Sequence, residues 1–269
     1  MNAYVEITRP NVCALAVLGI LIGSLVAGVF GFYPELAYAV IAAFLLCAGG
    51  NVINDFFDYN IDKINRPHRP IPRGEISPNQ ALYYYLALSV VGLAFAMLVS
   101  MPFFAIAIFN FAVFTFYPWI FKKMPFVKNL AVAWLGSVSF LAAGLIVNIS
   151  INTALLLLTA TSFVVVLSRE ILKDIEDVRG DSHAGIRTLP MVINRERAHV
   201  LAFVFLYIGC IMLAIPYLLG IFGLYYLIGA IPAVILCIYA ARLPPAKAQR
   251  TIKVAMYLVF LGFVLGAVL

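Results

Sequence analysis

Nine long runs of mostly apolar residues constrain this chain more than any other feature. A helix needs about 20 such residues to cross the hydrocarbon core of a membrane. With 64% apolar and 11% charged residues, the chain also has too little polar surface for a water-soluble globule of 269 residues. We therefore predict an all-α, polytopic membrane protein in which residues 1–269 form a single domain. The nine predicted transmembrane helices cover roughly residues 12–31, 35–57, 81–100, 103–121, 128–147, 151–170, 199–218, 221–241 and 251–268.

The basic residues predict how these spans are oriented. If successive loops alternate between two sides of the membrane, all 18 Lys and Arg residues fall on the side of the N-terminus. Cytoplasmic loops collect Lys and Arg, so the N-terminus is predicted inside and the C-terminus outside. Orientation also explains the net charge of +6, and no nucleic-acid partner is predicted. We expect a multi-pass protein of the cell membrane with its active site facing the cytoplasm.

Two short acidic stretches stand out because acidic residues are rare elsewhere. Residues 51–62 and 170–181 contain eight of the twelve Asp and Glu residues, and both contain the pattern D-x-x-D-x-x-x-D. On a helix, this spacing places the carboxylates on one face. A register of Asn54, Asp58 and Asp62 is also compatible with the first stretch. We name the two triplets the first acidic stripe (Asp55, Asp58 and Asp62) and the second acidic stripe (Asp174, Asp177 and Asp181).

Three like charges on one helix face repel one another and need a counter-ion. Mg²⁺ takes oxygen ligands and is usually held by one or two carboxylates together with substrate phosphates. Solvated acidic helix ends are the alternative, but two copies of one pattern at equivalent helix ends favour metal binding. We predict Mg²⁺ ions bridged by a diphosphate. The predicted metal ligands are both stripes and the amide that precedes the first: Asn54, Asp55, Asp58, Asp62, Asp174, Asp177 and Asp181.

The spacing of the two stripes predicts an internal repeat. They lie 119 residues and four predicted spans apart. Loops 121–128 and 241–250 are both short and basic, which fits the same period. We therefore expect two related four-helix units in parallel orientation, with the ninth span appended.

A basic, proline-rich loop follows the first acidic stripe. Residues 63–74 read K-I-N-R-P-H-R-P-I-P-R-G, and the prolines exclude a continuing helix. Arginine binds phosphate groups bidentately, so this loop next to carboxylates indicates a diphosphate site. An anchor for anionic lipid headgroups is the alternative. The same reasoning applies to Lys122 and to Lys173, which lies within the second acidic stretch. The predicted diphosphate-binding residues are therefore Lys122, Arg66 and Lys173.

Together these motifs resemble the UbiA superfamily of intramembrane prenyltransferases. Its signature N-D-x-x-D-x-x-x-D is matched by residues 54–62, and its D-x-x-x-D motif by Asp177 and Asp181 with Asp174 preceding. Tyr117 followed by Lys122 resembles the family's tyrosine-lysine element. The resemblance covers essentially the whole chain. It implies nine transmembrane helices and Mg²⁺-dependent prenyl transfer from a diphosphate.

Three stretches resemble an archaeal, lipid-synthesising branch of this family: EITRPNVCALAVLGILIG from Glu6, NRPHRPIPRG from Asn65 and SREILKDIEDVRGDSHAGIRTLP from Ser168. The resemblance implies transfer of a geranylgeranyl group from geranylgeranyl diphosphate to geranylgeranylglyceryl phosphate, which forms the second ether bond of archaeal membrane lipids. For this reaction, the charges and positions of two residues suggest catalytic roles. Lys122 would assist the departing diphosphate, and Asp181 would accept the hydroxyl proton. The candidates for binding the acceptor's phosphate are Arg66, Arg69 and Arg73.

Two other functions remain open on the sequence. Another branch of the family, with an aromatic or quinone-precursor acceptor, would keep the chemistry and change the acceptor pocket. A transporter or Mg²⁺ channel is less well supported. Transport normally needs ionisable groups near the middle of the membrane, and here they lie at the helix ends.

Overall fold

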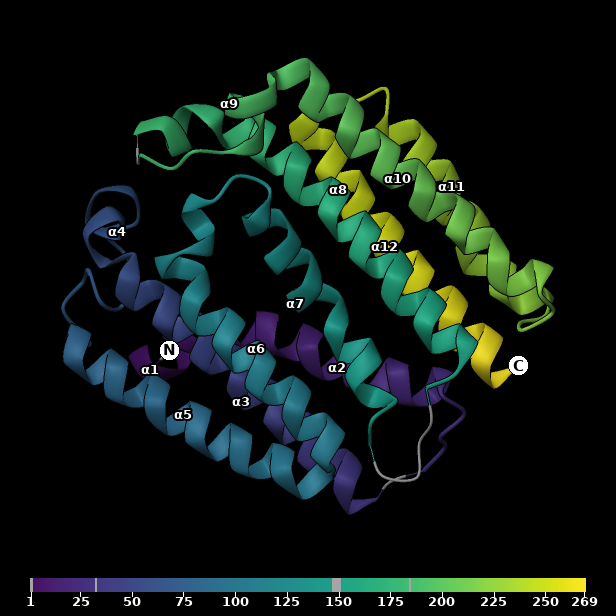
Figure 1. The fold of residues 1–269 in the computed structure, drawn as a ribbon, viewed down its shortest axis with the longest axis horizontal. Helices are drawn as coiled ribbons and strands as arrows, with labels where there is room; N and C mark the ends of the chain where they lie inside the picture. The colour runs from purple at the N-terminus through teal and green to yellow at the C-terminus, as the bar shows by residue number, and fades with distance from the viewer. Residues whose placement is uncertain (1, 32, 147–150, 184) are drawn as a thin grey trace. The chain divides into compact units, whose positions relative to one another are not determined.

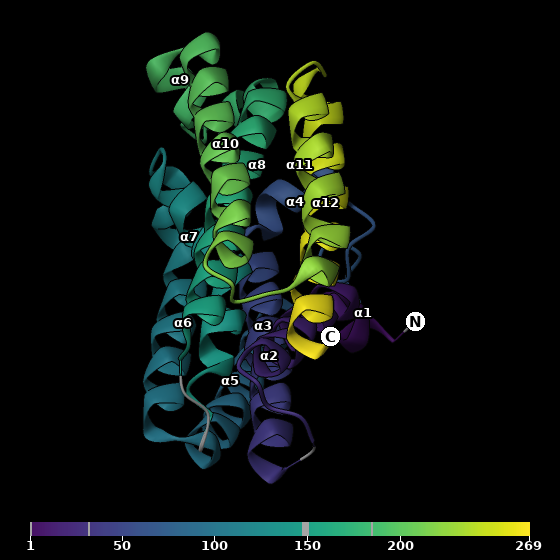
Figure 2. The same ribbon diagram turned by 90° about the vertical axis from the view of Figure 1, so that its right-hand side faces the viewer.

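The computed structural model describes residues 2–31, 33–146, 151–183 and 185–269 (Figures 1 and 2). The predicted end of the fifth span at residue 147 lies outside these residues, as does most of the predicted break at 148–152. The described residues form helices and no strand. The elements are α1 (Ala3–Thr8), α2 (Pro10–Val26), α3 (Pro34–Phe57), α4 (Tyr59–Asn65), α5 (Pro78–Val99), α6 (Met101–Trp119), η1 (Phe121–Lys123), α7 (Val127–Ala143), α8 (Thr153–His183), α9 (Leu189–Ile193), α10 (Arg195–Leu218), η2 (Leu224–Tyr226), α11 (Leu227–Ala240) and α12 (Pro245–Val268).

Six of the described helices are long and apolar enough to cross a membrane: α3, α5, α6, α8, α10 and α12. Three shorter apolar helices, Pro10–Val26, Val127–Ala143 and Leu224–Ala240, coincide with the first, fifth and eighth predicted spans. Many large apolar side chains point outward, such as Leu218, which is 75% exposed. Such surfaces suit lipid better than water. The prediction of an all-α, multi-pass membrane protein is confirmed, while the count of nine spans stays a prediction.

The contacts among residues divide the chain into two compact units. The first contains the described parts of Met1–Leu21, Gly31–Lys122 and Leu145–Ser150, and the second contains those of Ile22–Phe30, Lys123–Gly144 and Ile151–Leu269. The boundary after Lys122 falls between the fourth and fifth predicted spans, where the predicted repeat also has its boundary. Each unit carries one acidic stripe.

Helix α3 is the centre of the first unit, with α1, α5 and α6 packed against it (Figure 1). Gly50 permits the close approach of α6, because a Cβ there would lie 2.3 Å from the ring of Phe114. The proline-rich loop is held on this unit by Ile71 within it and Ile76 just after it, which are both buried in one core cluster with Val52 and Ile53 of α3. Burial of these two side chains fixes the path of the loop relative to α3.

The first acidic stripe crosses a break between two helices. α3 ends at Phe57 and α4 begins at Tyr59, with Asp58 between them. Helical hydrogen bonding nevertheless continues: the backbone N–H of Asp58 donates to the carbonyl of Asn54 (3.0 Å), and that of Asp62 donates to the carbonyl of Asp58 (2.8 Å). Because each bond joins residues four apart, the stripe keeps the shared face that its spacing predicts.

Helix α8 is the centre of the second unit, and α7, α10 and α12 pack against it (Figures 1 and 2). The helix begins at Thr153 and continues past the predicted end of the span at residue 170. It therefore includes the whole second acidic stripe, as the spacing predicts.

Two glycines allow α11 and α12 to come into backbone contact. A Cβ added at Gly229 would lie 2.2 Å from the carbonyl oxygen of Leu258 and 2.4 Å from the nitrogen of Gly262. A Cβ at Gly262 would lie 2.9 Å from the carbonyl oxygen of Tyr226. Small residues at a helix interface are a common way for membrane helices to pack closely.

We predict that Gly229→Ala destabilises the protein by about 1–3 kcal/mol, because the added methyl group forces α11 and α12 apart. The measurement is the thermal unfolding midpoint of detergent-purified protein. Gly223→Ala is the matched control, since a Cβ there meets nothing within 4 Å. An unchanged midpoint for Gly229→Ala would contradict this helix contact.

Candidate active site

Lys122 is paired with the central aspartate of the first acidic stripe. Its Nζ lies 2.6 and 2.7 Å from the two carboxylate oxygens of Asp58. Asn54 donates from Nδ2 to Asp58 over 3.1 Å. The Asp58 residue is only 9% exposed, so the ammonium group compensates a largely buried charge. The Asn54 to Asp58 hydrogen bond also shows that this predicted register shares a face.

Arg69 joins the other two aspartates of the stripe. Its Nη1 lies 3.0 Å from a carboxylate oxygen of Asp55 and also forms a short hydrogen bond with Asp62. Arg9 forms a second ion pair with Asp55. Both aspartates are buried, and Arg69 is itself mostly buried. Arg69 thus links two members of the Asp55, Asp58 and Asp62 register, while the third, Asp58, is held by Lys122 and Asn54.

The other two arginines predicted for phosphate binding lie outside this network. Arg66 is exposed at the end of α4. Arg73 forms ion pairs with Glu75 (2.6 Å) and Glu6 (3.1 Å). Its hydrogen bonds to Glu75 and Glu6 raise the pKa of Arg73. Of the three arginines, the structure therefore brings only Arg69 into contact with the first acidic stripe.

In the second unit, Lys128 and Asn129 hold the first aspartate of the second acidic stripe. Lys128 Nζ lies 2.8 Å from a carboxylate oxygen of Asp174, and Asn129 donates to the other oxygen over 2.9 Å. Asp174 and Asn129 are both buried. Asp181 lies farther from Lys128, at 3.5 Å, and is half-buried. Its carboxylate is therefore less tightly held than that of Asp174.

The remaining predicted residues of this unit are more exposed. The side chain of Asp177 is exposed on α8. Lys173 is 49% exposed and lies 3.8 Å from Glu170, which also pairs with Arg169 at 2.5 Å. The side chains of Asp177 and Lys173 are therefore both accessible to a ligand at this end of α8.

The donor chemistry of the two stripes fits Mg²⁺. Their side chains offer hard oxygen atoms, which Mg²⁺ prefers. Among the described residues, no group of three or more His, Cys, Asp or Glu side chains is gathered as a complete metal cage. Mg²⁺ does not need one, since it is typically held by one or two carboxylates, water and substrate phosphates.

Sequence reasoning did not assign Arg9, Lys128 or Asn129 to the site. Arg9 and Lys128 entered only the count of charges that predicts orientation. Arg9 lies 46 residues from its partner Asp55, and Lys128 lies 46 residues from its partner Asp174. No local spacing in the sequence therefore connects the partners. The available signal was an amide at Asn129 near the start of an otherwise apolar run.

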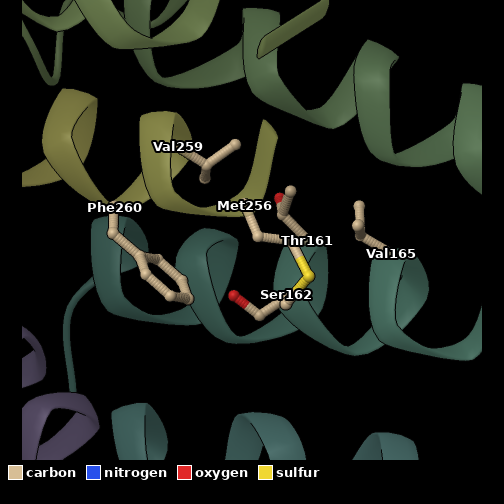
Figure 3. Close-up of a pocket in the computed structure, with 6 residues that line it drawn as sticks. All are labelled: Thr161, Ser162, Val165, Met256, Val259 and Phe260. Atoms are coloured by element: carbon tan, nitrogen blue, oxygen red, sulfur yellow. The ribbon is translucent and has the colours of Figure 1, made fainter. Parts of the chain in front are cut away.

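The second unit contains a small cavity (Figure 3). It lies between α8 and α12, and two hydroxyl groups in its wall, those of Thr161 and Ser162, have no hydrogen-bond partner among the described residues. Ser162 and Asp174 are twelve residues apart on one helix, or about 18 Å along its axis. The cavity is therefore separate from the acidic residues. Its lining residues are Thr161, Ser162, Val165, Met256, Val259 and Phe260.

Comparison with known proteins gives consistent results over the full length. A digeranylgeranylglyceryl phosphate synthase from Methanopyrus kandleri is 39% identical, over 98% of this chain and 98% of its own. A digeranylgeranylglyceryl phosphate synthase from Thermococcus gammatolerans is also 39% identical, over 100% of this chain and 99% of its own. A solved structure described as "Structural and mechanistic insights into the biosynthesis of Digeranylgeranylglyceryl phosphate synthase in membranes" has a TM-score of 0.87 and 31% identity, covering 99% of this chain and 98% of that one.

A more distant solved structure shares the fold. It is a UbiA homologue from Archaeoglobus fulgidus bound to GPP and Mg²⁺, with a TM-score of 0.71 and 19% identity, and 99% of each chain is covered. Residues 16–264 of this chain match the UbiA prenyltransferase family. The prediction of a prenyltransferase enzyme is thereby confirmed, and the chain belongs to the UbiA prenyltransferase family.

Proposed function

We propose that this protein transfers a geranylgeranyl group from geranylgeranyl diphosphate to geranylgeranylglyceryl phosphate in a Mg²⁺-dependent reaction. The observation that carries the proposal is the full-length similarity to proteins named digeranylgeranylglyceryl phosphate synthase. The buried carboxylates and their cations add physical support, because they provide the charges that a metal diphosphate needs. The product would carry the second ether bond of archaeal membrane lipids.

Each unit supplies one group of proposed metal-binding residues. In the first unit, the acids are buried at the end of an apolar helix and each is already paired with a cation. When bound, Mg²⁺ would neutralise the charge that develops on the diphosphate as its allylic C–O bond breaks. The proposed ligands are Asn54, Asp55, Asp58 and Asp62 in the first unit, and Asp174, Asp177 and Asp181 in the second.

The cations near the stripes have proposed roles in holding phosphate groups. Lys122 is proposed to donate to the diphosphate from its position beside Asp58. Arg66 and Lys173 are exposed and are proposed to bind it as well. Arg66, Arg69 and Arg73 are proposed for the phosphate of the acceptor. The ion pairs of Arg73 with Glu6 and Glu75 would have to be exchanged for that contact.

Asp181 is the proposed general base for the acceptor hydroxyl. Its carboxylate is half-buried and lies 3.5 Å from Lys128, so one of its oxygens can approach a hydroxyl proton without first breaking a short ion pair. The apolar residues of the spans would keep water away from the reacting carbon.

We also propose nine transmembrane spans in a single domain in the cell membrane, with the N-terminus and the active site on the cytoplasmic side. Among the described residues, six long and three shorter apolar helices support this topology. It is also supported because all 18 Lys and Arg residues fall on one side when nine spans are counted.

Asp58→Ala and Asp177→Ala are each expected to lower turnover by at least about a hundredfold, because each removes a proposed ligand of the Mg²⁺ that neutralises the departing diphosphate. Activity is measured with labelled geranylgeranyl diphosphate after purification in detergent. Glu196→Ala, on the exposed start of α10, serves as the matched control and should retain normal activity. Near-normal turnover by either aspartate variant would remove that residue from the proposed metal site.

Substrate choice is tested by offering geranylgeranylglyceryl phosphate in one reaction and 4-hydroxybenzoate in another, each with and without EDTA. We expect a product only from the glyceryl phosphate, and none after EDTA removes the metal. A product only from the aromatic acid would retain the prenyl-transfer chemistry and overturn the proposed acceptor. Product formation that is insensitive to EDTA would contradict the role of Mg²⁺.

A further inference from the structure

The joint between α1 and α2 has a strained backbone that its surroundings must hold in place. Arg9 ends α1 in the left-handed region, with φ 51° and ψ 68°, and Pro10 begins α2 directly after it. Left-handed conformations are uncommon for residues other than glycine and persist where neighbouring contacts enforce them. The backbone N–H of Arg9 donates to the carbonyl of Glu6 over 3.1 Å. This one hydrogen bond lies within α1 and its cap, so the joint needs further contacts to hold it.

Two residues one turn apart on α3 hold this joint. Asn51 donates from Nδ2 to the carbonyl oxygen of Thr8 over 2.8 Å, and Asp55 accepts from the guanidinium of Arg9. Residues four apart lie on the same face of a helix. The face of α3 that carries the first acidic stripe is thus also the face on which the joint is held.

Asp55 is shared between Arg9 and Arg69, and Arg69 in turn reaches Asp62. The four side chains form a continuous chain of ion pairs from the joint to the acidic stripe. The side chains of Asp55 and Asp62 are only 4% and 6% exposed, so neither carboxylate can be left without a cation at low cost. Without Arg9, Asp55 would depend on Arg69 alone, and Arg69 would be drawn away from Asp62.

We propose that Arg9 is a positioning residue for the metal site. By neutralising Asp55, it leaves Arg69 able to hold the Asp62 carboxylate in place. This inference rests on the proposed function, because it assumes that Asp62 helps to bind Mg²⁺ with diphosphate. In this role, Arg9 contacts neither the metal nor a substrate and acts only through Asp55.

The test measures metal binding rather than turnover. Mn²⁺, which shares the preference of Mg²⁺ for oxygen ligands, is titrated by electron paramagnetic resonance into detergent-purified protein with inorganic pyrophosphate present. Arg9→Gln is expected to weaken Mn²⁺ binding by at least about tenfold, as loss of an outer-shell partner does. Arg9→Lys keeps the charge and should lose less. Arg250→Gln, an exposed arginine on α12, is the matched control and should bind like the wild type.

A second comparison tests whether Arg9 acts through Asp55. Adding Arg9→Gln to Asp55→Asn should cause no further loss of Mn²⁺ affinity, since the partner is already absent. A further loss in the double variant would show that Arg9 acts by another route and would overturn the proposal. The double variant leaves no unpaired buried charge, so it is expected to fold even if Arg9→Gln alone does not, and Arg9→Lys then serves as the folded single variant.

The outcomes separate this inference from the proposed function. If the wild type binds Mn²⁺ and folded Arg9→Gln binds it equally well, Arg9 is not a positioning residue and the metal site stands. If the wild type does not bind Mn²⁺ with pyrophosphate, the metal site and the inference are both wrong. Thermal unfolding of each variant shows which samples are folded.

Discussion

The pairing of buried carboxylates with cations is the interaction on which the rest of the structure depends. Removing an ionised carboxylate from water costs several kcal/mol unless a partner compensates it. The partners here come from separate parts of the first unit: Arg9 from the joint before α2, Arg69 from the proline-rich loop and Lys122 from η1. Each ion pair therefore fixes the path of a chain segment as well as a charge. In this unit, the fold and the acidic site are stabilised by the same contacts.

The helices and the acidic patterns could be predicted from the sequence because both have a local signal. Apolar runs of sufficient length predicted helices at the right places, and a spacing of three and four residues predicted carboxylates on one face. Lys122 is predicted both as a phosphate-binding cation and through the family resemblance, and the structure brings it to Asp58. The metal and substrate roles of these residues stay proposals.

The pairing of particular cations with particular acids could not be predicted in this way. Arg9 and Asp55, like Lys128 and Asp174, are far apart in the sequence, and the fold alone brings them together. A count of basic residues treats Arg69 and Arg73 alike. In the structure, Arg69 binds the first acidic stripe, whereas Arg73 binds Glu6 and Glu75. The short break at Asp58 was also missed, because the backbone hydrogen bonds continue across it.

The three carboxylates of the first acidic stripe and the cations Arg9, Arg69 and Lys122 form a set with no net charge. Such a set exerts little long-range attraction on stray ions, since opposite charges a few ångströms apart largely cancel at a distance. A metal diphosphate would enter by exchanging partners with these residues. When the product diphosphate departs, the resident cations can return to the carboxylates, so the site resets without any other ion.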